Sequence, residues 1–159
     1  DEIFANAELG NADFVCSQTA QTGVLRRMIW LDREGPIAYL EPFKERLLAR
    51  RVTRFDENNW WKWGRRHHVS DAPRIYVNQK TRRPRPFFLD ACRNYDGAIL
   101  ALFPHRRDAG LEGLRDLLND VDWAELGFVC DGRFLFAQRS LAQALLPEDF
   151  APFATRALV

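Results

Sequence analysis

The sequence has few cysteines and no long apolar run. Its three cysteines, Cys16, Cys92 and Cys130, are odd in number and far apart, which favours reduced, buried thiols over a disulfide framework or a metal site. No apolar run approaches the roughly eighteen residues of a transmembrane helix, and the start of the chain lacks the basic residues and hydrophobic stretch of a secretory signal. These absences predict a cytoplasmic protein without a membrane anchor.

Recognisable catalytic and metal-binding motifs are also missing. The chain contains no G-x-S-x-G elbow, no P-loop, no H-E-x-x-H and no paired C-x-x-C. His67 and His68 are adjacent, so their rings diverge in a helix and point to opposite faces in a strand. Without ligands from elsewhere they would chelate a metal poorly. We therefore expect no catalytic residue, no metal and no cofactor in this chain.

Glycine and proline are too scarce for a disordered or fibrous chain, and 47% of the 159 residues are apolar. One domain spanning residues 1–159 is the default at this length. Composition and helical spacing predict strands at 24–31, 37–40, 73–78, 87–92 and 98–103, and helices at 41–51, 111–121 and 140–146. The Asp-Gly pairs at 96–97 and 131–132 predict two hairpins, the first joining 87–92 to 98–103. The sum is an α+β domain with a small mixed or antiparallel sheet and several short helices.

Positive charge is abundant in one segment. Residues 44–86 carry thirteen Lys and Arg against four acids, a formal charge of +9, so the other 116 residues carry −8 within a chain of net charge +1. Like charges repel, and the usual compensation is a polyanion whose condensed counterions are released on binding. Trp60, Trp61 and Trp63 are interleaved with these cations. Such rings can stack on bases or pack in a core, and the sequence leaves both roles open.

The residues expected to contact nucleic acid lie within this segment. Arginine and lysine in the proline-punctuated loop after Gln79 suit phosphates or a groove, and Asn78 is of the type that pairs with adenine. The predicted DNA-binding set comprises Arg50, Arg51, Arg54, Trp61, Lys62, Trp63, Arg65, Arg66, His67, His68, Arg74, Asn78, Lys80, Thr81, Arg82, Arg83 and Arg85.

Several runs between residues 72 and 147 form a series: APRIYVN and RPRPFF, then YDGAILALFP, then LRDLLNDVDWAELGF, and finally DGRFLFAQRSLAQALLP. This series resembles the C-terminal specificity domain of TaqI-like N6-adenine DNA methyltransferases from restriction-modification systems. The resemblance implies a target-recognition module that clamps duplex DNA, while a separate N-terminal domain binds S-adenosylmethionine and methylates a flipped adenine. Residue by residue it extends only to Arg74, Asn78, Lys80, Arg82 and Arg83.

The Gly-rich cofactor motif and N-P-P-Y tetrapeptide of that chemistry are absent, so the chain alone is expected to be inactive. The chain starts at Asp1 rather than Met, and we expect residues 1–13 to be a linker or arm from a missing methyltransferase domain. Sequence-specific duplex DNA binding is therefore the expected function, within a parent adenine-specific methyltransferase. Two other classes remain: an RNA-binding module whose tryptophans stack on unpaired bases, and a protein-interaction domain whose basic surface meets an acidic partner.

Overall fold

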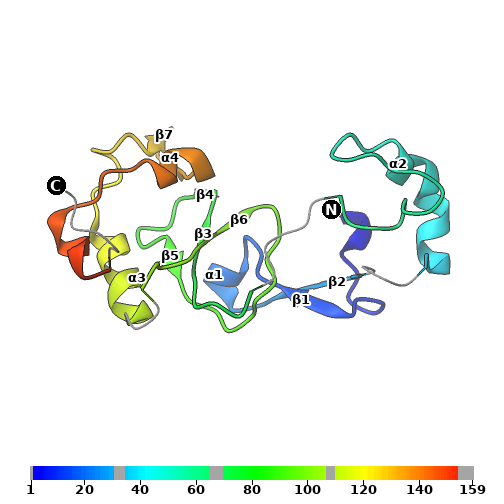
Figure 1. Cartoon of the computed structure of the whole chain (residues 1–159), viewed down its shortest axis with the longest axis horizontal. Coiled ribbons are helices and arrows are strands. Elements are labelled where there is room, and N and C mark those ends of the chain that lie inside the picture. Colours follow the sequence, from blue (N-terminus) through cyan, green and yellow to red (C-terminus); the bar gives the residue numbers. More distant parts are fainter. Residues whose placement is uncertain (1, 31–34, 65–69, 107–109, 154–159) are drawn as a thin grey trace.

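The computed structural model describes residues 2–30, 35–64, 70–106 and 110–153, and it confirms the α+β class (Figure 1). The strands are β1 (Ala12–Phe14), β2 (Arg26–Met28), β3 (Ile75–Asn78), β4 (Lys80–Thr81), β5 (Phe87–Phe88), β6 (Ile99–Leu102), β7 (Val129–Cys130) and β8 (Arg133–Leu135). The helices are α1 (Thr19–Thr22), α2 (Lys44–Leu48), α3 (Leu111–Asp120) and α4 (Gln138–Ala142), with 3-10 turns η1 (Glu2–Phe4), η2 (Ala38–Phe43) and η3 (Glu148–Phe153).

The described strands form small antiparallel sheets. β1 pairs with β2, β3 lies at the centre of the order β5-β3-β6, and β8 lies at the centre of the order β4-β8-β7. Only Gln79 separates β3 from β4, so the chain passes directly from one sheet into the other. The N–H of Gln79 donates to the carbonyl of Ala98 at 2.9 Å, and its own carbonyl accepts from the N–H of Phe136 at 2.8 Å. Gln79 therefore ties the two sheets together.

The first core lies in the right half of Figure 1, with the N-terminus and α2. Its buried members are Phe4, Phe14, Met28, Ile29, Leu40, Leu47 and Trp60. Residues 2–13, which the sequence predicts to be a linker or arm, contribute Phe4 to this core. Phe4 is fully buried in this core, and its carbonyl accepts from the N–H of Ile29 at 2.8 Å. Burying a phenylalanine ring is worth about 1.5–3 kcal/mol, so this segment belongs to the fold.

β3 is buried on both faces because its side chains enter two different cores. Tyr76 packs with Val15 and Ile99 on one face. Ile75 and Val77 enter the larger core on the other face, together with Phe87, Leu114, Leu118, Trp123, Phe128, Phe136 and Phe150. A strand covered on both sides is expected to be a continuous apolar run, and IYV is one.

Two elements predicted from local patterns are confirmed. α3 spans Leu111–Asp120 and buries Leu114 and Leu118, as the leucine spacing indicates. β7 and β8 form the second predicted hairpin, with Cys130 opposite Arg133. Asp131 and Gly132 both have positive φ, 50° and 68°, the conformation that a two-residue hairpin turn requires and that Asp-Gly adopts readily.

The first predicted hairpin is wrong. β5 and β6 do not pair with each other, because β3 lies between them and pairs with both. The Asp96-Gly97 turn is instead a local turn before β6, in which the Asp96 carboxylate accepts from the N–H of Ala98 at 2.9 Å. β3 is apolar and pairs along both of its edges, so it takes the central place between β5 and β6. A hairpin of β5 and β6 would have left β3 at the edge of the sheet.

Residues 37–51 also differ from the prediction of a strand followed by one helix. Residues 38–43 form η2, and α2 covers only Lys44–Leu48. Pro42 lies inside η2 and has no N–H for a helical bond. Beyond the end of the helix, the side chain of Arg50 turns back and donates to the carbonyl of Leu47 at 2.8 Å. The closing helix is also displaced, from the predicted 140–146 to Gln138–Ala142.

The cysteines are free thiols, but their exposure differs. Cys16 is buried, and Cys92 is half-buried, where burial raises the pKa of its thiol. Cys130 is exposed, which corrects the expectation that all three are buried. Both residues of β7 are exposed, since this two-residue strand lies at the edge of its sheet.

Tyr76 sets an alkaline limit on stability. Its side chain is fully buried, its hydroxyl donates to the carbonyl of Cys92 at 2.6 Å, and burial raises the pKa of Tyr76 from 10.0 to about 12. The folded chain therefore holds this proton more tightly than the unfolded chain. We expect its contribution to the free energy of unfolding to be complete below pH 10 and to fall by about 2–3 kcal/mol as the pH rises to 12.

Urea unfolding at a series of pH values will measure this fall. The control is Tyr76→Phe, which has no proton to lose and should show a shallower decline above pH 10. Equal declines in the two proteins would contradict the assignment to Tyr76.

Candidate nucleic-acid interface

The tryptophans of the basic segment pack in the first core. Trp60 is 2% exposed. Trp63 stacks on Phe14 with ring centroids 5.2 Å apart, and its Nε1 donates to the carbonyl of Ile29 at 2.9 Å. Trp61 is half-buried with its ring edge-on to Trp60. Packing therefore accounts for these rings, whose role the sequence left open. Phe14 covers one face of the Trp63 ring, so that face cannot stack on a base.

Arg50, predicted to bind DNA, is used inside the fold. Its Nη2 donates to the carbonyls of Trp60 at 2.7 Å and Lys62 at 2.9 Å. Its guanidinium also lies 3.8 Å from the centroid of the Phe55 ring. Burial lowers the pKa of Arg50. These contacts fasten the segment after α2 to the end of that helix, and they leave Arg50 poorly placed for a phosphate.

The rest of the predicted basic helix is only partly available. Lys44 pairs with Glu57 at 2.5 Å and lies 5.6 Å from the Trp60 ring; the hydrogen bond to Glu57 raises the pKa of Lys44. A second group of cations around α2 is exposed and forms no ion pair with a described carboxylate. We call this group the α2 patch: Arg46, Arg51 and Arg54.

Burial removes Arg74 and Asn78 from the predicted contact set. Arg74 is 1% exposed, and its guanidinium donates to the carbonyls of Arg93 at 3.0 Å and Ser70. Asn78 is 7% exposed, and its Nδ2 donates to the carbonyl of Ser17 at 2.8 Å. Neither side chain can reach a base or phosphate without unfolding part of β3. This is a correction, and its cause is the central position of β3.

The chain beyond Gln79 forms β4 and then a turn that leads to β5. We call residues 80–86 the basic loop, although its first two residues, Lys80 and Thr81, form a strand and not the loop expected from the sequence. Lys80 and Arg82 are exposed. Thr81 is half-buried, and its hydroxyl accepts from the N–H of Arg83 at 3.1 Å. Arg83 is half-buried, and its Nη1 is buried without a hydrogen-bond partner. Lys80 and Arg82 are therefore the cations of this loop that face solvent most freely.

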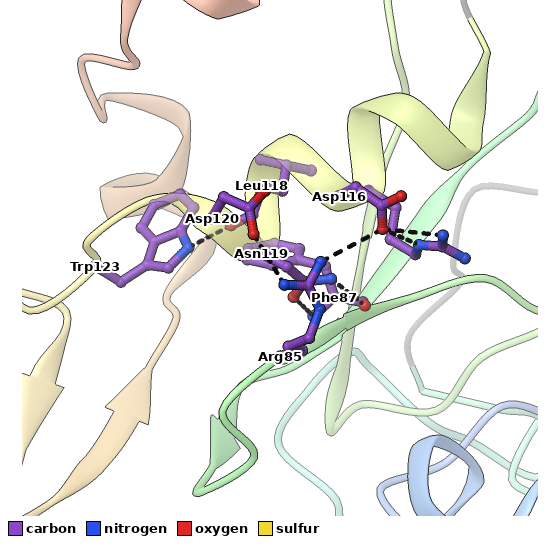
Figure 2. A network of polar contacts seen from close by, with 8 residues as sticks. Arg85, Phe87, Asp116, Leu118, Asn119, Asp120 and Trp123 are labelled. Carbon is purple, nitrogen blue, oxygen red and sulfur yellow. Dashed lines mark hydrogen bonds and ion pairs between the residues drawn. The ribbon is translucent and has the colours of Figure 1, made fainter.

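Arg85 differs from the other loop cations because acids of α3 neutralise it. Its Nη1 lies 2.8 Å from Asp120 and its Nη2 3.5 Å from Asp116 (Figure 2). The hydrogen bond to Asp120 raises the pKa of Arg85. A guanidinium already paired with two carboxylates attracts a phosphate less strongly, so Arg85 is a weaker candidate than the sequence suggested.

Arg133 joins Lys80 and Arg82 although it comes from the acidic half of the chain. Lys80 lies opposite Leu135 in the β4–β8 pairing, and Thr81 lies opposite Phe134. Because side chains alternate along a strand, Lys80 and Arg133 lie on the face opposite Phe134, which packs on the larger core. We call these three cations the sheet patch: Lys80, Arg82 and Arg133.

Sequence reasoning missed Arg133 because the charge count ended at residue 86. The Asp-Gly hairpin is the sequence signal that could have identified Arg133. Arg133 directly follows Asp131-Gly132 and is the first residue of β8, the strand that pairs with β4. Of the remaining predicted residues, Lys62 is half-buried, and Arg65, Arg66, His67 and His68 lie outside the described residues. The α2 patch and the sheet patch lie on different elements along the long axis (Figure 1), so the basic segment divides into two surfaces.

The described parts of the chain offer neither a metal-ligand cluster nor a membrane-spanning helix. They contain no cluster of three or more His, Cys, Asp or Glu residues able to hold a metal ion. No helix in these ranges has the length and apolarity needed to cross a membrane. Comparison with known proteins found no matching family model, curated protein or solved structure.

Proposed function

We propose that the chain binds duplex DNA as the specificity domain of an adenine-N6 DNA methyltransferase. The sheet patch carries this proposal. Lys80 and Arg82 are exposed, Arg133 is half-buried beside them, and none of the three forms an ion pair with a carboxylate of the described residues. Unneutralised cations on the paired strands β4 and β8 and on the residue that follows β4 attract a polyanion, and binding releases the counterions of that polyanion.

Arg85 differs from the three cations of the sheet patch because it is paired with acids. Acids were available to neutralise the loop, since α3 presents Asp116 and Asp120 to Arg85. None of the three cations of the sheet patch forms an ion pair with a described carboxylate, so their charge is left for a partner. The α2 patch adds exposed arginines of the same kind. In this proposal the S-adenosylmethionine chemistry belongs to a separate domain of the parent protein.

DNA binding is tested by titrating the chain with a labelled duplex at several salt concentrations. We expect the logarithm of the association constant to fall with the logarithm of salt at a slope of about −4 to −7, as four to eight phosphate contacts require. The triple change Lys80→Ala, Arg82→Ala and Arg133→Ala should weaken binding roughly 30- to 100-fold at low salt and make the slope shallower by about 3.

Arg27→Ala is the matched control, because it also removes an arginine charge. Its guanidinium already pairs with Asp13 at 3.1 Å, so we expect less than about a twofold change in DNA affinity. No binding to duplex even at low salt would refute the proposal. Preference for single-stranded RNA over duplex would favour the RNA-binding alternative, and oligomers in light scattering without DNA binding would favour a protein-interaction domain.

A further inference from the structure

Helix α3 fastens the end of the basic loop through an amide that imitates a neighbouring strand. The Oδ1 of Asn119 accepts from the N–H of Phe87 at 2.9 Å, and its Nδ2 donates to the carbonyl of Phe87 at 2.9 Å (Figure 2). Phe87 lies in β5, at the edge of the order β5-β3-β6. An edge strand exposes unpaired backbone groups. Asn119 satisfies both groups of Phe87 with one side chain.

The Arg85 ion pairs add a second attachment to the same helix. Asp120 and Asp116 lie one turn apart on α3 and flank Asn119 in Figure 2. Asp116 is shared with Arg115, whose Nε donates to it at 3.0 Å. Each of these pairs is exposed and contributes little to stability alone. Together they fix the direction of Arg85 beside the Asn119–Phe87 contact.

The opposite end of the loop is fastened to β8. Lys80 and Thr81 pair with Leu135 and Phe134. Within the loop, Pro84 and Pro86 each fix a backbone φ angle, and Pro86 is buried. The loop is therefore held at both ends and stiffened between them, while Lys80 and Arg82 project from it.

We propose that Asn119, supported by Asp116 and Asp120, is a positioning residue that holds the basic loop ready for phosphate contact. This inference rests on the proposed DNA-binding function. A cationic loop that is loose in the free protein must be ordered when DNA binds, and that ordering reduces affinity. Asn119 does not touch DNA in this scheme. It acts by presenting Lys80 and Arg82 in a fixed arrangement before DNA arrives.

A double-mutant cycle tests the positioning role. Asn119→Ala should weaken duplex binding roughly fivefold in the otherwise unchanged chain, but less than about twofold when Lys80→Ala and Arg82→Ala are already present. The reason is that a residue acting through these two cations has nothing left to position once they are gone. A residue that merely supports the fold would cause the same loss in both backgrounds, which would overturn the inference.

Asp120→Asn provides a second test, in which the substituted side chain is not part of the buried core. Asp120 has an exposed side chain, so this variant should fold. Removing a negative charge near DNA should by itself tighten binding. If Asp120 helps to position the loop, its loss should instead weaken binding roughly two- to threefold. Tighter binding by Asp120→Asn would overturn the inference.

Hydrogen exchange reports the contact directly, and Asn94→Ala is the matched control. Asn94 is also half-buried and makes one side-chain bond, from Nδ2 to the carbonyl of Asp13 at 3.2 Å. The amide hydrogen of Phe87 should exchange faster in Asn119→Ala, and its exchange rate should be unchanged in Asn94→Ala. Only Asn119→Ala should lose DNA affinity. Equal affinity losses in these two variants would count against positioning. If the unchanged chain binds no duplex, the proposed function fails as well.

Discussion

Replacing Trp123 by alanine is expected to lower the free energy of unfolding by about 3–5 kcal/mol. The side chain is 2% exposed, and its ring centroid lies within 5.2–5.4 Å of the rings of Phe87, Phe128 and Phe136. Its Nε1 donates to the carbonyl of Leu118 at 2.7 Å. Trp123 therefore contacts β5, α3 and the residues on either side of the β7–β8 hairpin. Alanine would leave a cavity where these elements meet.

Urea unfolding followed by circular dichroism measures this loss. A total stability of about 5–15 kcal/mol is usual for a domain, so the variant should be near the limit of folding at physiological temperature. Trp123→Phe is the graded control, since it retains most ring contacts and loses the bond to Leu118; we expect about 1–2 kcal/mol. A loss below about 1 kcal/mol for Trp123→Ala would show that the larger core repacks around the gap.

Replacing Arg74 by alanine is the second change expected to have a large effect. It should lower the free energy of unfolding by about 3–5 kcal/mol. The side chain is 1% exposed and lies 4.7 Å from the centroid of the Phe103 ring. It donates to the carbonyls of Ala72, Arg93 and Ser70. Removing it takes this donor from the carbonyls of Arg93 and Ser70, leaves Ala72 only its longer bond from Arg93, and opens a cavity.

Arg74→Met separates the two causes, because methionine fills much of the volume but donates no hydrogen bond. It should recover about 1–2 kcal/mol relative to alanine. The matched control is Arg93→Ala, which removes an exposed arginine that donates to the same Ala72 carbonyl at 3.4 Å. We expect about 0.5 kcal/mol or less there. Similar losses for Arg74→Ala and Arg93→Ala in thermal and urea unfolding would contradict the role assigned to Arg74.

DNA binding offers an independent readout for Arg74. Because its guanidinium is enclosed, Arg74→Met should leave the salt slope of duplex binding unchanged in protein that is still folded. A shallower slope would mean that Arg74 contacts phosphate after all.

Local signals were enough to predict some elements. The leucines of α3 repeat at helical spacing, and Asp131-Gly132 is a hairpin turn whose backbone requirement is visible in two residues. The pairing of β3 with both β5 and β6 could not be predicted in the same way. That choice depends on which strand is covered on both faces, and the covering residues come from distant parts of the chain.

The candidate site shows the same division between local and distant causes. The sequence singled out Lys80 and Arg82, which the structure leaves exposed, but it placed Lys80 in a loop and the structure places it in β4. It could not distinguish Arg74, because a buried arginine and a surface arginine look alike in a charge count. Nor could it foresee that Arg85 is neutralised by acids 31 and 35 positions further along the chain.

The contacts between the end of β1, which packs in the first core, and the turn before β6 have a consequence for the order of folding. Residues of that core lie between Phe4 and Trp60, so it can close before the rest of the chain emerges during synthesis. The N–H of Val15 donates to the carbonyl of Asn94, and the carbonyl of Val15 accepts from the N–H of Asp96. These contacts close a loop of about eighty residues, and such distant pairings form slowly. Until then, Val15 and its neighbours present an unpaired edge to which another chain could attach.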